Sequence, residues 1–343
     1  MTPPTTQAPL LSVRDLTVTF GTKNERPFTA VDSLSFDVHP GQTVGIVGES
    51  GCGKSVTSLA VMGLLPPHGN QVTGTVSYDG QDLLALPDKE LRAKRGQKIS
   101  MIFQDPLSSL NPVVPIGRQV SEVIERHQGL SRRAAMPRAR EMLDKVGIPD
   151  PDRRLTDYPH QLSGGMRQRA LIAMALACEP RLLIADEPTT ALDVTIQAQI
   201  LALLRELVED TGTALIMITH DLGVVAGLCD EINVLYGGRL VERAERHHLF
   251  AEPRHPYTGG LLASVPSLDG DRRARLNPVP GSVADNLPWT SACAFAPRCA
   301  NAVEQCRERT PALVVHDERA LRCFNPLAGP PSPAEDAVTE EVR

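Results

Sequence analysis

The chain has 343 residues, of which 41% are apolar, and it carries a formal net charge of −6. A domain commonly has about 100–200 residues, so this length allows more than one hydrophobic core, and we expect one large and one small domain. A net negative charge provides no broad positive field for a polyphosphate backbone. Nucleic acid is therefore not an expected partner.

The chain is not expected to span a membrane. Its long uncharged stretch at residues 55–78 is interrupted by prolines and polar side chains, whereas a spanning helix needs about 20 mostly apolar residues. The N-terminus has neither a basic segment nor a long apolar segment, so no secretory signal is expected. Seven cysteines, four of them crowded near the C-terminus, fit a reducing compartment better than a disulfide framework. These features predict a cytosolic protein.

The first part of the chain reads as strands followed by a loop and a helix. Residues 11–20 and 31–38 alternate apolar and polar side chains, which predicts half-buried antiparallel strands. Residues 43–47 are apolar and β-branched and end in glycines, and residues 54–65 show helical apolar periodicity. This order predicts a strand, a glycine loop and a helix.

The chain becomes polar and helical from Pro106 to about His160. Amphipathic helices are expected at residues 116–127 and 132–146, between proline-rich joints. Together with the helix that follows, this region predicts a helical subdomain over about residues 106–178.

Helices and strands then alternate up to about residue 242. The expected elements are helix 163–178, strand 182–186, helix 194–210, strand 214–219, helix 222–229, and strands 232–235 and 239–242. Such alternation favours a mainly parallel sheet covered by helices. Beyond about residue 250 the composition shifts to Pro, Arg and Cys, and disorder is expected at residues 327–343.

A phosphate-loop pattern follows the strand at residues 43–47. It reads Gly48-Glu49-Ser50-Gly51-Cys52-Gly53-Lys54-Ser55. Backbone N–H groups of such a loop converge on the β-phosphate of a nucleotide, and the helix N-terminus adds a partial positive charge. Lys54 is expected to contact the β- and γ-phosphates, and the Ser55 hydroxyl to ligate Mg²⁺. A plain glycine-rich turn is the alternative interpretation.

The strand at residues 182–186 would deliver Asp186 and Glu187 to its C-terminal end, where ligands bind in parallel sheets. Asp186 is expected to hold Mg²⁺ directly or through water, and Glu187 to act as the base that polarises the attacking water. An acidic pair in this position is also common at a solvated helix start. The assignment therefore depends on the phosphate loop.

A further glycine motif, Leu162-Ser163-Gly164-Gly165-Met166, begins a helix between these two motifs. Ser163 is a plausible cap, and the glycines allow close backbone approach to an anion. The three motifs in this order resemble the ATP-binding cassette (ABC) ATPases, whose signature reads LSGG at this point. The resemblance implies a P-loop α/β fold over residues 1–250, with a RecA-like parallel core, an antiparallel β subdomain and a helical signature subdomain. Because no internal repeat occurs, one cassette is expected.

Two more catalytic positions are implied by the resemblance. Gln104, after an expected strand at residues 99–103, matches the family's lid glutamine, which senses Mg²⁺ and water and links to the membrane subunits. His220, after the strand at residues 214–219, matches the switch histidine near the γ-phosphate.

The resemblance also implies two further nucleotide-site positions. Asp193 matches the family's dimer-contact loop, although Thr190 stands where serine is often found. Phe20 matches the aromatic residue that stacks on adenine, where tyrosine is commoner, and Phe28 is a competing candidate. Stacking needs only a π face, so phenylalanine suffices.

The sequence Arg254-His255-Pro256-Tyr257-Thr258 and residues 261–266 resemble the C-terminal extension of dipeptide, oligopeptide and nickel importer ATPases. In isolation this motif would be a short loop stopped by proline, without specificity. Its place after a cassette implies an importer-type extension over residues 251–326.

The extension also contains a cysteine group, Cys293, Cys299, Cys306 and Cys323. Four thiolates suit either zinc or an iron–sulfur cluster. The spacing lacks the tight two-residue knuckles of structural zinc, and some members of this importer group carry [4Fe–4S] in the extension. The resemblance therefore implies [4Fe–4S], with zinc and simple packing of cysteines as alternatives.

The resemblance as a whole implies an ATP- and Mg²⁺-dependent ATPase that powers an importer for dipeptides, oligopeptides or similar small solutes such as nickel. It implies four partners: a second ABC ATPase subunit, two transmembrane permease subunits and an extracytoplasmic solute-binding protein. The chain would lie peripherally at the cytoplasmic face of the inner membrane.

Three other functions fit the sequence less well. A soluble cassette ATPase of repair or translation usually fuses two cassettes or inserts a coiled coil, and neither is present. A regulatory module without hydrolysis is disfavoured by Glu187 and His220. An exporter is disfavoured by the C-terminal extension.

Overall fold

The computed structural model describes residues 8–21, 27–190, 192–264, 279–283, 291–316 and 318–328. Residues from 329 onward, to which most of the expected C-terminal disorder refers, lie outside the described residues. So do Val265 and Pro266 of the motif that resembles the importer extension.

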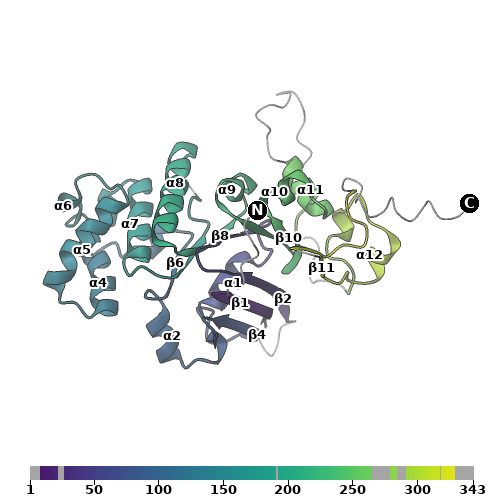
Figure 1. Ribbon diagram of the computed structural model, residues 1–343, viewed down its shortest axis with the longest axis horizontal. Helices are drawn as coiled ribbons and strands as arrows, with labels where there is room; N and C mark the ends of the chain where they lie inside the picture. The colour runs from purple at the N-terminus through teal and green to yellow at the C-terminus, as the bar shows by residue number, and fades with distance from the viewer. Residues whose placement is uncertain are drawn as a thin grey trace, which may run out of the picture.

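A single eight-stranded sheet runs through the molecule, in the order β11-β12-β10-β9-β3-β8-β7-β6 (Figure 1). Its parallel part consists of β6 (Ile99–Ile102), β7 (Leu182–Asp186), β8 (Ala214–Thr219), β3 (Thr43–Val47) and β9 (Glu231–Tyr236). Every residue of β3, β7 and β8 is buried. Parallel strands covered on both faces are continuous apolar runs, which is why the sequence predicted these three strands with the bounds observed.

A second, four-stranded sheet has the order β2-β1-β4-β5. Its strands are β1 (Leu11–Phe20), β2 (Phe28–Val38), β4 (Asn70–Tyr78) and β5 (Gln81–Asp82). The antiparallel pairing of β1 with β2, expected from the alternating pattern, is confirmed. β4 pairs with β1 along most of its length but was not predicted, because most of its side chains are polar or exposed.

Helices lie along the main sheet and at both of its ends (Figure 1). Figure 1 shows α4 to α7 at one end and α11 and α12 at the other. The helices are α1 (Lys54–Val61), α2 (Asp88–Lys94), α3 (Pro106–Ser109), α4 (Ile116–Gln128), α5 (Arg132–Lys145), α6 (Pro151–Arg154), α7 (Gly164–Leu176), α8 (Val194–Thr211), α9 (Leu222–Leu228), α10 (Arg246–Ala251), α11 (Pro256–Ala263) and α12 (Glu304–Glu308). Within the ranges that the structure describes, none of these helices has the length and apolarity needed to cross a membrane.

The expected helix at residues 54–65 was too long at its C-terminal end. α1 stops at Val61, and Gly63 follows with a φ of 60°. Glycine adopts this left-handed conformation readily just after a helix, and Pro66 and Pro67 then prevent its continuation.

The C-terminal extension is joined to the main sheet. Its strand β12 (Arg319–Leu321) pairs antiparallel with β10 (Arg239–Glu245), and β11 (Val314–His316) pairs with β12. Tyr257 and Phe295 belong to the same apolar core as residues of the parallel strands. The extension and the cassette thus share a sheet and a core.

The buried carboxylate of Glu242 ties three parts of this region together. One oxygen accepts hydrogen bonds from the Arg254 N–H at 2.9 Å and the Arg319 guanidinium at 2.8 Å, and the other accepts from the His255 N–H at 2.9 Å. Glu242 lies on β10, and its side chain is completely buried. A buried charge needs such partners, so β10, β12 and the start of α11 depend on one another.

We predict that Glu242→Ala loosens the extension. Removing one member of a buried ion pair leaves the Arg319 charge without its partner and costs about 3–5 kcal/mol of folding free energy. Limited proteolysis should cut the extension faster than in the parent, and the melting temperature should fall. The control is Glu209→Ala, which removes an exposed carboxylate paired with Arg205 on α8 and should change neither measurement. Equal proteolysis of Glu242→Ala and the parent would contradict the role given to Glu242.

Candidate functional site

The phosphate-loop residues connect β3 to α1, as the sequence predicted. Gly48 and Gly53 have φ values of 153° and 95°, and a Cβ on either would collide with a backbone carbonyl oxygen, that of Leu235 or of Ala30. Only glycine fits these two positions. Ser50 and Gly51 are exposed, whereas Cys52 is buried beneath the loop.

Lys54 is buried at the start of α1 and points back into the loop. Its Nζ donates to the carbonyl oxygens of Gly48 at 2.7 Å and Glu49 at 3.0 Å. The cap of α1 is Gly53, which has no side chain to accept from the first helical N–H groups. These donors and the ammonium group therefore form a site with a net attraction for an anion.

The Ser55 hydroxyl and Asp186 meet across the ends of two elements. Ser55 Oγ donates to Asp186 Oδ1 at 3.1 Å. Burial raises the pKa of Asp186, and the hydrogen bond from Ser55 only partly offsets it. A hydroxyl oxygen beside a carboxylate is the kind of oxygen pair that Mg²⁺ prefers, so the residues present fit that ion.

Glu187 is held by three polar side chains. Its Oε2 accepts from Gln104 Nε2 at 2.9 Å and from Thr190 Oγ1 at 2.8 Å, and its Oε1 lies 3.3 Å from His220 Nδ1. Its φ of 46° is uncommon for a residue with a side chain and marks stored backbone strain, which often accompanies a functional position. The structure thus brings Gln104 and His220 to Glu187. It also brings Thr190, which the sequence indicated only as part of the dimer-contact loop.

The two adjacent carboxyls have opposite pKa shifts. Burial on its own would raise the pKa of Glu187, but the hydrogen bonds from Thr190 and His220 outweigh burial and hold this pKa below its usual value. Burial dominates at Asp186, where the pKa is raised. Neighbouring acids with pKa values pushed apart can perform different tasks, and Glu187 is the one kept ionised.

The signature and dimer-contact residues lie apart from this group. Ser163 and Asp193 are exposed caps whose side chains accept from the N–H groups of Met166 at 3.3 Å and Ile196 at 3.0 Å, respectively. Gly164 is exposed and Gly165 packs toward α8, where a Cβ would crowd Ile196. In the parts of the chain that the structure describes, no hydrogen bond or ion pair joins these residues to the phosphate loop.

The two candidates for base stacking occupy the same strand end. Phe20 ends β1 and lies directly opposite Phe28 on β2, and both are half-buried. Either ring could therefore present a face to a base at this end of the small sheet.

The four extension cysteines share one region. The Cys293 N–H donates to the Cys306 carbonyl at 2.9 Å, and burial, with Cys293, Cys299 and Cys306 nearby, raises the pKa of Cys323 to about 11. All four thiols are free. Even so, no three His, Cys, Asp or Glu side chains of the described residues are arranged to hold a metal ion.

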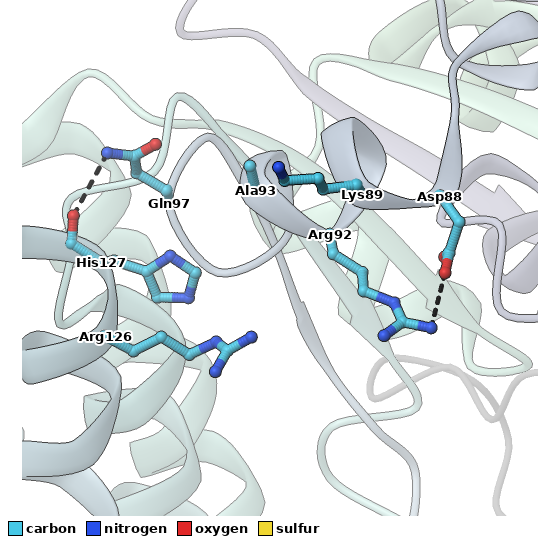
Figure 2. Close-up of a pocket in the computed structure, with 7 residues that line it drawn as sticks. All are labelled: Asp88, Lys89, Arg92, Ala93, Gln97, Arg126 and His127. Atoms are coloured by element: carbon cyan, nitrogen blue, oxygen red, sulfur yellow. Dashed lines mark hydrogen bonds and ion pairs between the residues drawn. The ribbon is translucent and has the colours of Figure 1, made fainter.

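A pocket of about 620 Å³ lies between α2 and the end of α4 (Figure 2). Figure 2 shows Asp88 paired with Arg92 and Gln97 bonded to the His127 carbonyl. None of the residues that were predicted to bind nucleotide lines this pocket. It is therefore separate from the phosphate loop.

Comparison of the sequence with known families gives two matches. The model of the family described as "ABC transporter" matches residues 31–190, and that described as "Oligopeptide/dipeptide transporter, C-terminal region" matches residues 241–306. The oligopeptide transport ATP-binding protein OppD of Salmonella typhimurium is 49% identical over 327 residues, which cover 94% of this chain and 97% of OppD. The dipeptide transport ATP-binding protein DppD of Bacillus subtilis is 50% identical over 317 residues, which cover 92% of this chain and 94% of DppD.

Solved structures give the same picture of the fold. The dimeric structure of a post-hydrolysis state of the ATP-binding cassette MJ0796 bound to ADP and Pi superposes with a TM-score of 0.61 at 29% identity, covering 69% of this chain and 98% of that chain. CbiO1 from Clostridium perfringens, part of the ABC transporter complex cbiONQ, has a TM-score of 0.60 at 27% identity and covers 72% of this chain and 92% of its own. The P-loop α/β fold class expected from the sequence is confirmed.

We predict that Asp186→Asn stabilises the nucleotide-free protein. Because burial raises the pKa of Asp186, its ionisation costs folding free energy once the pH exceeds the unfolded value of about 4. Removing that charge should raise the melting temperature at neutral pH by about 1–3 °C, and the gain should fade as the pH falls toward 4.

The same variant should gain less stability from added Mg²⁺ and ATP than the parent does. Thermal unfolding with and without the ligand measures both effects. Asp210→Asn, the same replacement at an exposed residue of α8, is the control and should change neither. A lower ligand-free melting temperature for Asp186→Asn would refute this reading of the buried carboxyl.

Proposed function

The chain belongs to the ABC transporter family, and on this premise we propose that it is the ATP-hydrolysing subunit of an importer for dipeptides or oligopeptides. The observation that carries the proposal is that Ser55 contacts Asp186 and that the charge of Lys54 acts on both Asp186 and Glu187. The peptide solute is supported by the C-terminal family match and by the names of the relatives that span nearly the whole chain.

The phosphate loop is proposed to bind the triphosphate. Lys54 would exchange its bonds to the loop carbonyls for bonds to the β- and γ-phosphates, and the N–H groups at the start of α1 would add further donors. Ser55, Asp186 and Gln104 would hold Mg²⁺. When bound, that ion neutralises the charge that develops on the phosphates.

Glu187 is proposed to act as the base. Its lowered pKa keeps the carboxylate ionised at neutral pH, so it can accept a proton from the attacking water. The direction of this carboxylate is fixed by its contacts with Gln104, Thr190 and His220. His220 is proposed to contact the γ-phosphate as well. Glu187 is thus held in one orientation by its neighbours, as preorganisation of a catalytic group requires.

The signature and dimer-contact residues are proposed to contact the nucleotide that a second ATPase subunit binds. Ser163, Gly164 and Asp193 are exposed, so they are free to close over nucleotide held by that subunit. The solved relative MJ0796 is a dimer bound to ADP and Pi, which supports this arrangement. The pair would act with two transmembrane permease subunits and an extracytoplasmic solute-binding protein, at the cytoplasmic face of the inner membrane.

We predict that Glu187→Gln and Lys54→Ala have different effects. Glu187→Gln should leave ATP binding intact and lower turnover by roughly 10²–10⁴-fold, which is typical for loss of a general base. Lys54→Ala should weaken ATP binding itself, because it removes the buried ammonium group from the loop. Phosphate release and equilibrium binding in the assembled transporter measure the two effects.

The control for this pair is Glu209→Gln, the same change at an exposed residue of α8, which should behave like the parent. Parental turnover in Glu187→Gln would refute the assignment of the base.

The extension cysteines are proposed to hold a [4Fe–4S] cluster, with zinc as the alternative, that acts as a folding clamp. The support is chemical: four free thiols gather within a region of short elements. The four thiols, as the structure describes them, are not arranged as a set of metal ligands. Binding of a cluster or of zinc would therefore have to bring them closer together. Coordination present only in the folded state would add its free energy to folding.

Protein purified without oxygen is expected to be brown and to contain about four iron and four sulfide per chain. Cys299→Ser should remove the colour and make the extension sensitive to protease, while ATP binding persists. Cys178→Ser, outside the extension, is the control and should keep the colour. Zinc in place of iron would favour the alternative. Protein that contains neither iron nor zinc would refute the clamp.

A further inference from the structure

The second residue of the phosphate loop, Glu49, is held by two residues of the C-terminal extension. The Glu49 N–H donates to the Tyr257 hydroxyl at 2.9 Å. The two carboxylate oxygens of Glu49 accept from the Arg298 guanidinium at 2.9 and 3.0 Å. The extension therefore touches the loop at its backbone and at its side chain.

The Arg298 guanidinium is fixed in place. Its side chain is only 5% exposed, whereas that of Glu49 is 26% exposed. The Arg298 guanidinium also donates to the carbonyl oxygens of Pro280 at 2.6 Å and Gly281 at 3.0 Å. Its central carbon lies 5.7 Å from the centre of the Tyr236 ring. A cation this deeply buried needs a counter-ion, and Glu49 is the carboxylate that pairs with it in two parallel hydrogen bonds.

Tyr257 is equally well fixed. It is completely buried, and its ring packs edge-on against Tyr236 with centroids 4.8 Å apart and lies 5.3 Å from the Phe295 ring. Burial raises the pKa of its hydroxyl, which therefore stays protonated and neutral. The rings of Tyr236, Tyr257 and Phe295 thus pack together between the cassette and the extension, and Tyr257 contacts the phosphate loop directly.

The charge of Glu49 matters because of where it sits. Its backbone carbonyl and that of Gly48 accept from Lys54, the residue proposed to receive the phosphates. An unpaired carboxylate at this point would repel a triphosphate, and at a half-buried site a charge a few ångströms away changes a binding equilibrium by about tenfold or more. Neutralising Glu49 therefore favours nucleotide binding.

We propose that Arg298 is a positioning residue for the nucleotide site: it neutralises Glu49 and, with Tyr257, makes ATP affinity depend on the C-terminal extension. This inference rests on the proposed ATP site. Arg298 lies in a short helical turn, Ala296–Arg298, between Cys293 and Cys299, so the conformation of the cysteine-bearing segment sets the place of its guanidinium.

The test measures ATP binding and turnover in the assembled transporter for the parent, Arg298→Ala and the double variant Glu49→Gln/Arg298→Ala. Arg298→Ala should weaken ATP binding by about tenfold or more, with a loss that shrinks at high salt. Its turnover at saturating ATP should stay close to the parental value, because Glu187 and its partners are unchanged. The double variant should regain most of the lost affinity, since it carries no unpaired carboxylate.

Two further variants separate charge from simple packing. Glu49→Gln alone leaves the Arg298 charge beside the loop, so it should bind ATP more tightly than the parent, whereas a purely structural tether predicts weaker binding. Arg309→Ala removes a positive charge from the same extension, where it lies over the Phe324 ring, and should bind ATP like the parent.

Parental affinity in Arg298→Ala would overturn the inference. A double variant that binds ATP as weakly as Arg298→Ala would also overturn it. So would Glu49→Gln protein that binds ATP more weakly than the parent, and this last measurement remains decisive if the Arg298 variants fail to fold. A parent that binds no ATP would refute the proposed function itself, and this inference with it.

Discussion

The nucleotide site depends on the register of three buried parallel strands. β3 and β8 pair so that Val47 faces Thr219, and β7 and β8 pair so that Asp186 faces Ile218. The strands therefore end level with one another, and the residues that follow them leave the sheet along one edge. A slip of one residue would turn every side chain of a strand to the opposite face and disrupt the close packing on both sides of the sheet.

This edge accounts for the chemistry of the acidic pair. Asp186 is the last residue of β7 and remains inside the sheet, where burial raises its pKa. Glu187 is the first residue beyond the strand, and its N–H still bonds to the Ile218 carbonyl at 2.8 Å although its φ is positive. The ladder to β8 thus holds a strained backbone that points the Glu187 carboxylate toward Gln104 and His220.

The sequence allowed the central strands and most of the site to be predicted, for a physical reason. β3, β7 and β8 are continuous apolar runs with motif residues at their ends, so local pattern and tertiary place agree. β4 was missed because strand pairing, rather than an apolar pattern, defines it.

Two contacts could not be predicted from the sequence. Thr190 reaches Glu187 only because of the turn after β7, and Arg298 reaches Glu49 across 249 positions of sequence. The division into a cassette ending at residue 250 and a separate extension remains a prediction. β12 pairs with β10 across that boundary, so sheet pairing does not divide the chain there.

The two ends of the sheet act on different parts of the site. Gln104 follows the edge strand β6 and leads into the helices at one end, and it contacts Glu187, the proposed base. Arg298 and Tyr257 belong to the extension at the other end, and they contact Glu49 of the phosphate loop. Movement of the helical end would therefore alter hydrolysis, whereas a change in the extension would alter nucleotide affinity. The parallel strands lie between the two contacts. If the proposed roles hold, we therefore expect binding and hydrolysis to respond to different ends of one cassette.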